Sequence, residues 1–496
     1  MKKLGVLMVC MALSLFLFAG SASAVDVKFS GNFNVMGLYE AQPFTGADWT
    51  YMNPVTGLPE LHQDKSTAFI FQELKLKTVF EVSPGLSLTM RFQALTKAWV
   101  DRDWAGTRGD SLGRFQDGNG LARENIEIQD LYMSYAAGKV GTFHVGYVPH
   151  DTAFGPVFGA SERPLALIQW GKPVGDFSFG FKYMKSFEGS TTWKNTLATG
   201  RHNQWASLAT DGDRIHLAAT AVYKKDPVFT GLKWAYTDNR ANRPFTNVLA
   251  PGVIPIPPGS PATQGEWSMQ THMFTYFAVL NFGPVKIEGK TEYLFGKQDF
   301  EDGRKDARVN GLSAYLNAEV APGPFTFGGT YAYVSGNDPA TRRMEHPGTG
   351  ATNGAYSTWG GQDYNPALIM WNEDRNEWRG PLGNPALGDN RVYSGVINAH
   401  MVSVYGNYRP TADWDLKLTY LFARAAERPM ETNVGRYVSK TYGHELDFVA
   451  TYKITNNLKY SVGAGYLWAG DYFKGGDDTR DIDDDYLFMN KLSLTF

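Results

Sequence analysis

Three features are scarce in this chain of 496 residues: cysteine, long hydrophobic runs and an excess of basic residues. The single cysteine, Cys10, lies in the first 24 residues, so a protein that begins near residue 25 has no thiol. Thiolate catalysis and cysteine-ligated zinc are therefore excluded, and the composition suits an oxidising compartment. After residue 24 no apolar run reaches the roughly 18 residues of a membrane-spanning helix. The chain has 47 basic and 50 acidic residues, so we expect no nucleic-acid partner, which would require a basic surface.

Enzyme motifs are also lacking. The nine histidines are scattered, and no HExxH or GxSxG motif occurs. Asp447 follows His444 by three residues, but an odd spacing on a strand puts the two side chains on opposite faces. We therefore expect no catalytic residues and no enzymatic activity.

The first 24 residues have the features of a secretory signal peptide. Two lysines at positions 2 and 3 precede an apolar run over residues 4–18, and small residues occupy positions 22–24. We expect signal-peptide-dependent export, cleavage before Val25 and a single domain over residues 25–496.

Aromatic residues and glycine are abundant, with 26 tyrosines, 31 phenylalanines and 53 glycines. Apolar and polar residues alternate over segments such as 86–93, 177–184, 285–293 and 445–453, which is the period of a β-strand. A chain that crosses a membrane without helices must close into a barrel, because only closure satisfies every backbone N–H and C=O group in lipid. We therefore expect an all-β transmembrane antiparallel barrel whose apolar side chains face lipid and whose charged side chains face the interior.

A soluble β-sandwich would show the same alternation, so strand length and aromatic placement decide between the two folds. The alternating segments run about ten residues or more, whereas strands of soluble proteins average about five or six. Aromatic residues also gather at strand ends, as an interfacial girdle requires. The examples are Tyr39, Trp99, Tyr183, Tyr223, Trp414 and Trp468.

Short turns and long loops alternate along the whole chain. Eight short turns rich in Pro, Gly, Asn and Asp lie at residues 83–86, 137–140, 173–176, 225–228, 282–285, 322–325, 409–412 and 455–458. Nine longer connections lie at roughly 40–65, 102–123, 149–161, 188–210, 239–266, 298–305, 336–392, 427–437 and 471–482. This pattern predicts about 18 strands with short periplasmic turns and long extracellular loops. The segment 163–172 is a poor strand, and merging one hairpin would give 16.

The last strand has one apolar face and one polar face. The apolar face is formed by Tyr486, Phe488, Leu492, Leu494 and the terminal Phe496. We interpret this strand as the signal for the outer-membrane assembly machinery, and we expect it to close the barrel by pairing with the first strand, residues 27–39.

With this leader, strand pattern and terminal phenylalanine, the chain resembles the outer-membrane homotrimeric porins of sulfate-reducing bacteria. The resemblance includes the first strand, Val27-Lys28-Phe29-Ser30-Gly31-Asn32-Phe33. It implies a homotrimer in the cell outer membrane of a Gram-negative bacterium, in contact with lipid and lipopolysaccharide. The function implied is that of a water-filled channel for passive diffusion of small hydrophilic solutes and ions.

The last third of the chain is also similar to alginate-export barrels. The residues involved are Gly443-His444-Glu445-Leu446-Asp447-Phe448 before Tyr452, then Gly463, Gly465 and Tyr466, and Tyr364-Asn365-Pro366. This similarity implies a monomeric substrate-specific channel or polysaccharide exporter as the alternative. A surface adhesin that uses the long loop 337–392 is a third possibility.

Strand register predicts which charged side chains line the interior. The candidates are Lys75, Lys77, Arg91, Lys97, Lys286, Glu288, Lys290, Glu292, Glu445 and Asp447. We hypothesise that the four basic residues at positions 75–97 face the acidic residues across the bore and set ion selectivity. The alternative is that these residues are solvated without a selective role.

Two loops carry further candidates. The third loop, residues 150–159, is unusually apolar, so we predict that it folds inward and narrows the pore. Contact between subunits is the alternative. The candidate constriction residues are His150, Asp151, Phe154 and Phe158. The ninth loop crowds acidic residues, of which Asp477, Asp478 and Asp481 are a weak Ca²⁺ candidate, although their spacing matches no EF-hand loop. They could instead bridge lipopolysaccharide through divalent ions. We expect no firm metal site and no cofactor.

Overall fold

The fold is seen in a computed structural model. It describes residues 25–41, 49–52, 59–62, 66–98, 126–149, 154, 164–187, 214–242, 267–300, 305–341, 343–344, 365–372, 375, 382–383, 392, 395–431 and 434–496. In this part of the chain no helix is long and apolar enough to cross a membrane.

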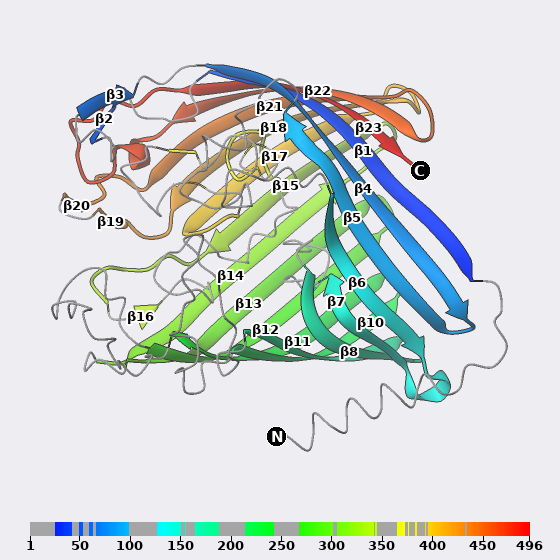
Figure 1. The fold of residues 1–496 in the computed structure, drawn as a ribbon. Helices are drawn as coiled ribbons and strands as arrows, with labels where there is room; N and C mark the ends of the chain where they lie inside the picture. Colours follow the sequence, from blue (N-terminus) through cyan, green and yellow to red (C-terminus); the bar gives the residue numbers. More distant parts are fainter. Residues whose placement is uncertain are drawn as a thin grey trace.

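Eighteen antiparallel strands close into a barrel, as the sequence predicts (Figure 1). In chain order they are β1 (Asp26–Glu40), β4 (Thr67–Ser83), β5 (Leu86–Ala98), β6 (Ile126–Ala136), β7 (Thr142–Pro149), β8 (Pro164–Val174), β9 (Phe177–Phe187), β10 (Arg214–Lys225), β11 (Val228–Asn242), β12 (Trp267–Phe282), β13 (Val285–Phe300), β14 (Ala307–Val320), β15 (Phe325–Val334), β17 (Ala399–Tyr408), β18 (Trp414–Ala425), β21 (Thr441–Lys453), β22 (Leu458–Ala469) and β23 (Asp485–Thr495). Each pairs with its neighbours in the chain, and the order closes at β1 and β23. The alternative of 16 strands is wrong.

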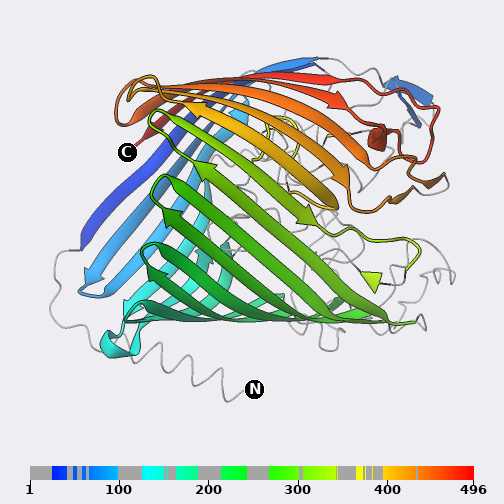
Figure 2. The same ribbon diagram turned by 180° about the vertical axis from the view of Figure 1, so that it is seen from behind.

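All eight predicted short turns join paired strands at one end of the barrel, where the carboxyl terminus also lies (Figure 2). Gly175 and Gly283 sit in two of these turns with φ of 59° and 61°, a conformation that side chains with a Cβ rarely adopt. The interpretation of residues 163–172 as a poor strand is wrong, because Pro164–Val174 forms strand β8 and pairs with both β7 and β9. Two prolines, Pro164 and Pro173, made this strand hard to predict. Its β propensity comes from the apolar residues Leu165, Leu167 and Ile168 and the aromatic Trp170.

At the opposite end of the barrel lie the small elements of the long loops (Figure 1). Strands β2 (Trp49–Met52) and β3 (Pro59–His62) form one hairpin, and β19 (Met430–Glu431) and β20 (Gly435–Arg436) form another. The short strand β16 (Arg343–Met344) pairs in parallel with β14. Single 3-10 turns occur at η1 (Gly138–Val140), in a short turn, and at η5 (Asp471–Lys474), in the ninth loop.

The strands turn apolar side chains outward and polar side chains inward. On β9 and β21, for example, Phe179, Phe181 and Phe448 are exposed on the outer wall, whereas Glu445 and Asp447 are buried inside. A soluble protein would bury the phenylalanines and expose the carboxylates. The outer wall is therefore a surface suited to lipid, as expected for a transmembrane barrel.

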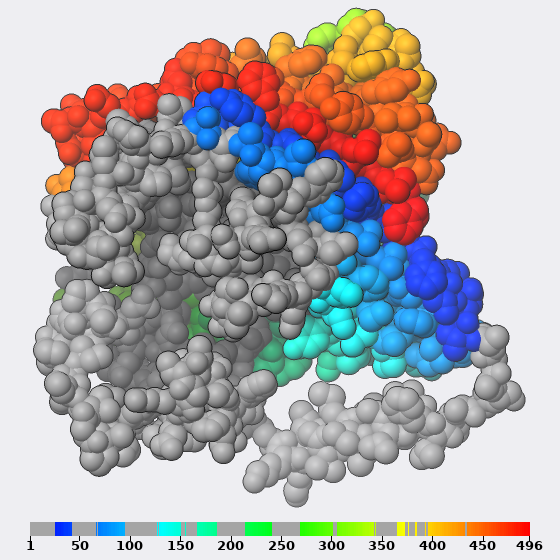
Figure 3. Space-filling view, turned by 45° about the horizontal axis from the view of Figure 1, so that its top comes forward, coloured from blue at the N-terminus to red at the C-terminus, as the bar shows by residue number. Residues whose placement is uncertain are grey.

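The seam between the first and last strands follows the predicted pairing. Val35 pairs with Leu492 and Phe33 with Leu494, and Gly31 and Phe496 exchange two backbone hydrogen bonds of 2.8 and 3.0 Å. The side chains of the red last strand lie beside those of the blue first strand (Figure 3). The five predicted assembly-signal residues, Tyr486, Phe488, Leu492, Leu494 and Phe496, all have exposed side chains on the outer wall.

Replacing Phe496 by Asp should reduce the amount of folded barrel in the membrane without reducing secretion, because a carboxylate would replace an apolar group on the outer wall. The measurement is the yield of heat-modifiable, protease-resistant barrel in isolated membranes. Thr495→Asp is the matched control, since it adds the same charge on the inward-facing parity of the same strand. Equal yields of the Phe496 variant and the wild type would contradict this role for the terminal residue.

Candidate functional site

The inner wall carries most of the predicted pore-lining residues. Lys75 and Lys77 lie on β4, with Lys77 paired to Arg91 on β5, and all three follow the inward parity set by the buried Phe71. Lys286, Glu288, Lys290 and Glu292 alternate on the inner face of β13. Lys97 lies beyond an irregularity in the β4–β5 register, where its backbone pairs with Gln72.

These charges are paired within their own part of the wall rather than across the bore. Lys75 lies 3.2 Å from Glu73, and the Arg91 guanidinium lies 2.7 Å from the Asp130 carboxylate of β6. On β13, Lys286 is 2.5 Å from Glu288. Lys290 and Glu292, 2.9 Å apart, form a buried pair, and Thr275 donates a hydrogen bond to Glu292. Four of the predicted cations thus have an acidic neighbour on the same or the adjacent strand: Lys75, Arg91, Lys286 and Lys290.

Glu445 and Asp447 face inward but do not line an open bore, which corrects their assignment as pore-lining residues. A segment of the seventh loop, residues 365–372, lies directly over them; we call it the plug. The backbone N–H groups of Ile369 and Met370 donate to the two Glu445 carboxylate oxygens at 2.6 and 2.9 Å. The N–H of Leu368 donates to Asp447 at 3.1 Å. Two acids of one strand therefore bind three consecutive amides of the plug.

Two glycines of β22 provide the space in which the plug lies. A Cβ at Gly463 would come within 3.2 Å of the Leu368 side chain, and a Cβ at Gly465 would come within 3.2 Å of Leu368 and 2.6 Å of Asp447. Any larger residue at position 465 would therefore displace either the plug or the carboxylate that holds it. Two of the segments that suggested similarity to alginate-export barrels, 443–448 and 463–466, meet at this point.

A buried ion pair at Arg375, three residues beyond the plug, fixes the seventh loop to the first strand. The Arg375 guanidinium lies 2.8 and 2.5 Å from one oxygen of Glu40 on β1, and both side chains are almost completely buried. The Asn372 side chain bridges the segment internally, accepting from the N–H of Arg375 and donating to the carbonyl of Ala367. Removal of one partner of such a pair leaves an uncompensated buried charge.

Apolar packing completes the enclosure of the plug. Ile369, Met370 and Trp371 are buried in a cluster with inward residues of β15, β17, β18, β22 and β23. The Trp371 ring meets the Tyr442 ring edge-on at 5.4 Å. The cluster also takes in Tyr472 and Phe473 of η5, so the ninth loop packs against the same core.

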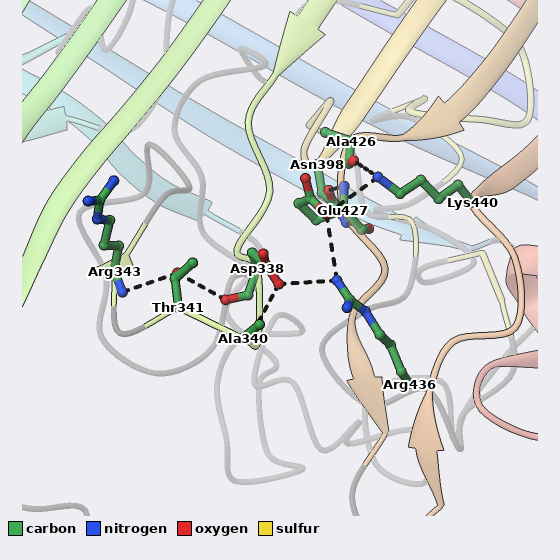
Figure 4. Close-up of polar contacts among 9 residues, drawn as sticks. All are labelled: Asp338, Ala340, Thr341, Arg343, Asn398, Ala426, Glu427, Arg436 and Lys440. Carbon is green, nitrogen blue, oxygen red and sulfur yellow. Dashed lines mark hydrogen bonds and ion pairs between the residues drawn. The ribbon is translucent and has the colours of Figure 1, made fainter.

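Polar contacts hold both ends of the seventh loop against the eighth loop (Figure 4). At the start, the Arg436 guanidinium donates to Asp338 at 3.1 Å. At the end, Asn398 and Glu427 exchange two hydrogen bonds, from the Asn398 side-chain amide to the Glu427 carbonyl at 2.9 Å and from the Glu427 N–H to the Asn398 side chain at 2.8 Å. Lys440 reaches the Glu427 carboxylate at 3.4 Å.

The ninth loop is tied to the eighth by a second ion pair. Arg480 donates to both carboxylate oxygens of Glu431 at 2.6 and 2.7 Å. Burial alone would raise the pKa of Glu431, but the hydrogen bonds from Arg480 and from the Gly476 N–H outweigh it and hold the pKa below its ordinary value. Glu431 therefore stays ionised and paired at neutral pH.

The acidic residues of the ninth loop do not converge on a metal-sized space. Asp477 accepts hydrogen bonds from the N–H and the hydroxyl of Thr479 at 3.0 and 2.6 Å, and Asp478 pairs with Lys474 at 3.4 Å. Among the described residues no group of three or more His, Cys, Asp or Glu side chains is arranged to hold a metal ion. The geometry thus gives no support to calcium binding by Asp477, Asp478 and Asp481.

Of the four constriction-loop candidates, Phe154 lies within the described residues, and His150, Asp151 and Phe158 lie outside them. The Phe154 ring meets the ring of Phe277, an inward residue of β12, edge-on at 5.0 Å. A Cβ at Gly231 of β11 would come within 2.9 Å of the same ring. Phe154 is therefore inside the barrel; narrowing of the pore by the third loop stays a prediction.

The sequence reading missed the plug and its partner Glu40. A signal was present: Ala367-Leu368-Ile369-Met370-Trp371 is an unbroken apolar run inside a long polar loop. The same reasoning that singled out the third loop, that a free loop should be polar, applies to this run.

The chain has no match among family models or curated proteins. In fold it is similar to solved outer-membrane proteins. One is opdK from Pseudomonas aeruginosa, with 9% identity, a TM-score of 0.47, and coverage of 95% of this chain and 98% of that one. Another is a BenF-like porin from Pseudomonas fluorescens Pf-5, with 11% identity, a TM-score of 0.46, and coverage of 95% and 99%. The likeness concerns the barrel fold. The resemblances to porins of sulfate-reducing bacteria and to alginate-export barrels stay predictions.

Replacing Arg375 by Met should release the plug segment, because breaking a buried pair on one side costs about 3–5 kcal/mol. Limited proteolysis of the folded barrel should then cut the seventh loop faster than in the wild type. Arg436→Met is the control, because its partly exposed contact with Asp338 contributes at most about 1 kcal/mol. The double variant Glu40→Leu, Arg375→Met should regain resistance. Unchanged cleavage in Arg375→Met would mean that the ion pair does not hold the loop.

Proposed function

We propose that the protein is an outer-membrane porin, a water-filled channel for passive diffusion of small hydrophilic solutes and ions. The observation that carries this proposal is the closed wall of 18 strands with apolar side chains outside and charged side chains inside. Barrels of about 16 to 18 strands are wide enough to leave an aqueous bore. Charged groups on an inner wall are stable only if water or polar partners reach them.

The plug limits the size of solute that this channel would pass. It fills the space in front of β21 and β22, and Arg375 just beyond it binds β1, so this part of the loop reduces the cross-section on one side of the barrel. Inward residues nearer the short turns, among them Lys77 and Lys417, keep exposed side chains. A channel with a filled sector and an open remainder suits small solutes better than polymers.

A substrate-specific channel or polysaccharide exporter is the alternative. It is favoured by the specific fit between the plug and the recess at Gly463 and Gly465, which is more elaborate than a passive pore requires. A plug that moved out of the bore would admit larger solutes.

We further propose that the barrel works as a homotrimer. Asn490 lies at the middle of β23 with an exposed side chain on the outer wall, beside Gly37 of β1 and Val462 of β22. Its amide nitrogen occupies the space above Gly37, 2.7 Å from where a Cβ would lie. An amide facing hydrocarbon is costly without a hydrogen-bond partner. A neighbouring copy of the chain would supply that partner.

The long-loop end of the outer wall suits the outer leaflet of the outer membrane. Lys297 of β13 pairs across the ladder with Arg308 of β14 on the outward face, and Asp299 lies 2.7 Å from Lys297. Exposed cations at this level would contact the phosphates of lipopolysaccharide. Export by the signal peptide and insertion by the assembly machinery complete this proposal for localisation.

Liposomes containing the purified protein should swell in isotonic solutions of small sugars, with the rate falling steeply as sugar size increases, because the plug reduces the bore. The test compares a series from pentose to tetrasaccharide. An adhesin closed by its own loops would give no swelling with any sugar, and an exporter would discriminate between sugars of equal size.

Replacing Asn490 by Leu should shift the detergent-extracted protein from trimer toward monomer in native mass spectrometry, because the amide would no longer hydrogen-bond to a neighbour. Val404→Asn, an exposed position on β17, is a control that adds an amide elsewhere on the outer wall. A monomeric wild-type protein, or a variant that remains fully trimeric, would count against the role of Asn490.

A further inference from the structure

We propose that the channel prefers small anions over cations, because the seventh loop buries acidic residues of the inner wall while inward-facing lysines and arginine stay accessible. This inference rests on the proposed porin function and assigns a solute class to it. It follows from comparing the burial of the two signs of charge.

The acids near the plug are inaccessible to a passing ion. Glu445 and Glu40 are 0% exposed and Asp447 is 4% exposed. Their oxygens accept from three plug amides and from the Arg375 guanidinium. Carboxylates that are buried to this degree are out of reach of a cation in the bore. The sector that would otherwise form the acidic side of the channel is thereby removed from contact with solutes.

Lys75, Lys77 and Arg91 on β4 and β5 keep accessible side chains, whereas Lys290 of β13 is buried together with Glu292. Lys75 keeps 21% and Arg91 keeps 18% of its side-chain surface, although each also contacts an acid. Their acidic neighbours are less accessible, with 14% for Glu73 and 3% for Asp130. Lys77, two residues beyond Lys75 on β4, is exposed.

The same asymmetry recurs on β18. Lys417 is exposed, and its ammonium group lies 5.1 Å from the centre of the Tyr405 ring. The carboxylate of the nearby Glu319 accepts a hydrogen bond from the Tyr405 hydroxyl at 2.9 Å. The inward Asp415 of β18 keeps 39% of its side-chain surface but lies 2.8 Å from the Arg409 guanidinium. On β4 and β5 the cation is the more accessible member of its ion pair.

An ion in a narrow bore replaces part of its hydration shell with the groups that it can touch. In this wall an anion can touch ammonium and guanidinium groups, whereas a cation finds most of the carboxylates occupied. Low-dielectric walls strengthen this difference. Chloride, inorganic phosphate and small carboxylates are the class of solute that the lining favours.

Reversal potentials test the inference. The purified full-length protein is inserted into planar bilayers that separate two KCl solutions of unequal concentration, and conductance and reversal potential are both recorded. The expected result is a conducting channel whose reversal potential has the sign of chloride preference. Conduction with no preference, or with potassium preference, would overturn the inference while leaving the porin function intact. Absence of conductance would overturn both.

Two variants test the physical cause. Lys75→Gln, Lys77→Gln, Lys417→Gln should lower the chloride-to-potassium permeability ratio toward one; Lys225→Gln, in an exposed short turn, should not change it. Deletion of residues 367–372 should raise conductance and move the ratio further toward potassium, because Glu445 and Asp447 become accessible. If the deletion variant fails to assemble, the lysine variant alone decides, and an unchanged ratio there would overturn the inference.

Discussion

The hydrogen bonds between β1 and β23 are the interaction on which the rest of the structure depends. In lipid every unpaired backbone group is costly, so an open sheet of this size would have two intolerable edges. The pairing from Asn32–Thr495 to Glu40–Leu487 removes both edges at once. Closure also creates an interior. Alternate residues of every strand then face an enclosed volume, which contains ion pairs such as Lys290–Glu292.

The enclosed volume contains a second kind of order that strand alternation does not create. On the long-loop side, the inner faces of β15, β17 and β18 carry apolar residues such as Val334, Met401 and Leu421, all fully buried. Loops bring the complementary apolar groups, including Trp371 and Phe473. In its wall the barrel directs apolar groups toward lipid, whereas in this part of its interior apolar side chains form a compact core, as in a soluble protein.

The fold was predictable from the sequence, whereas the contacts of the plug were not, because they join residues that lie far apart in the chain. Strand number follows from local signals, since Gly175 or Gly283 marks a turn whatever the rest of the chain does. Register gave the inward direction of Lys75 and Glu445 from two-residue periodicity alone. The contacts of the plug span 75 residues from Met370 to Glu445 and 335 residues from Arg375 to Glu40. Nothing in the pattern around Glu445 distinguishes a solvated carboxylate from one that binds a loop.

The Glu40–Arg375 contact also imposes an order on folding. Glu40 belongs to the first strand and Glu445 to the sixteenth. The seventh loop joins both, because Ile369 of the plug binds Glu445 and Arg375 binds Glu40. In a sheet that has not yet closed, those two strands lie at nearly opposite edges, and no loop can reach both partners. The plug can consequently dock only after the barrel has closed. A barrel whose folding stops before closure has no docked plug and can be distinguished from the complete one.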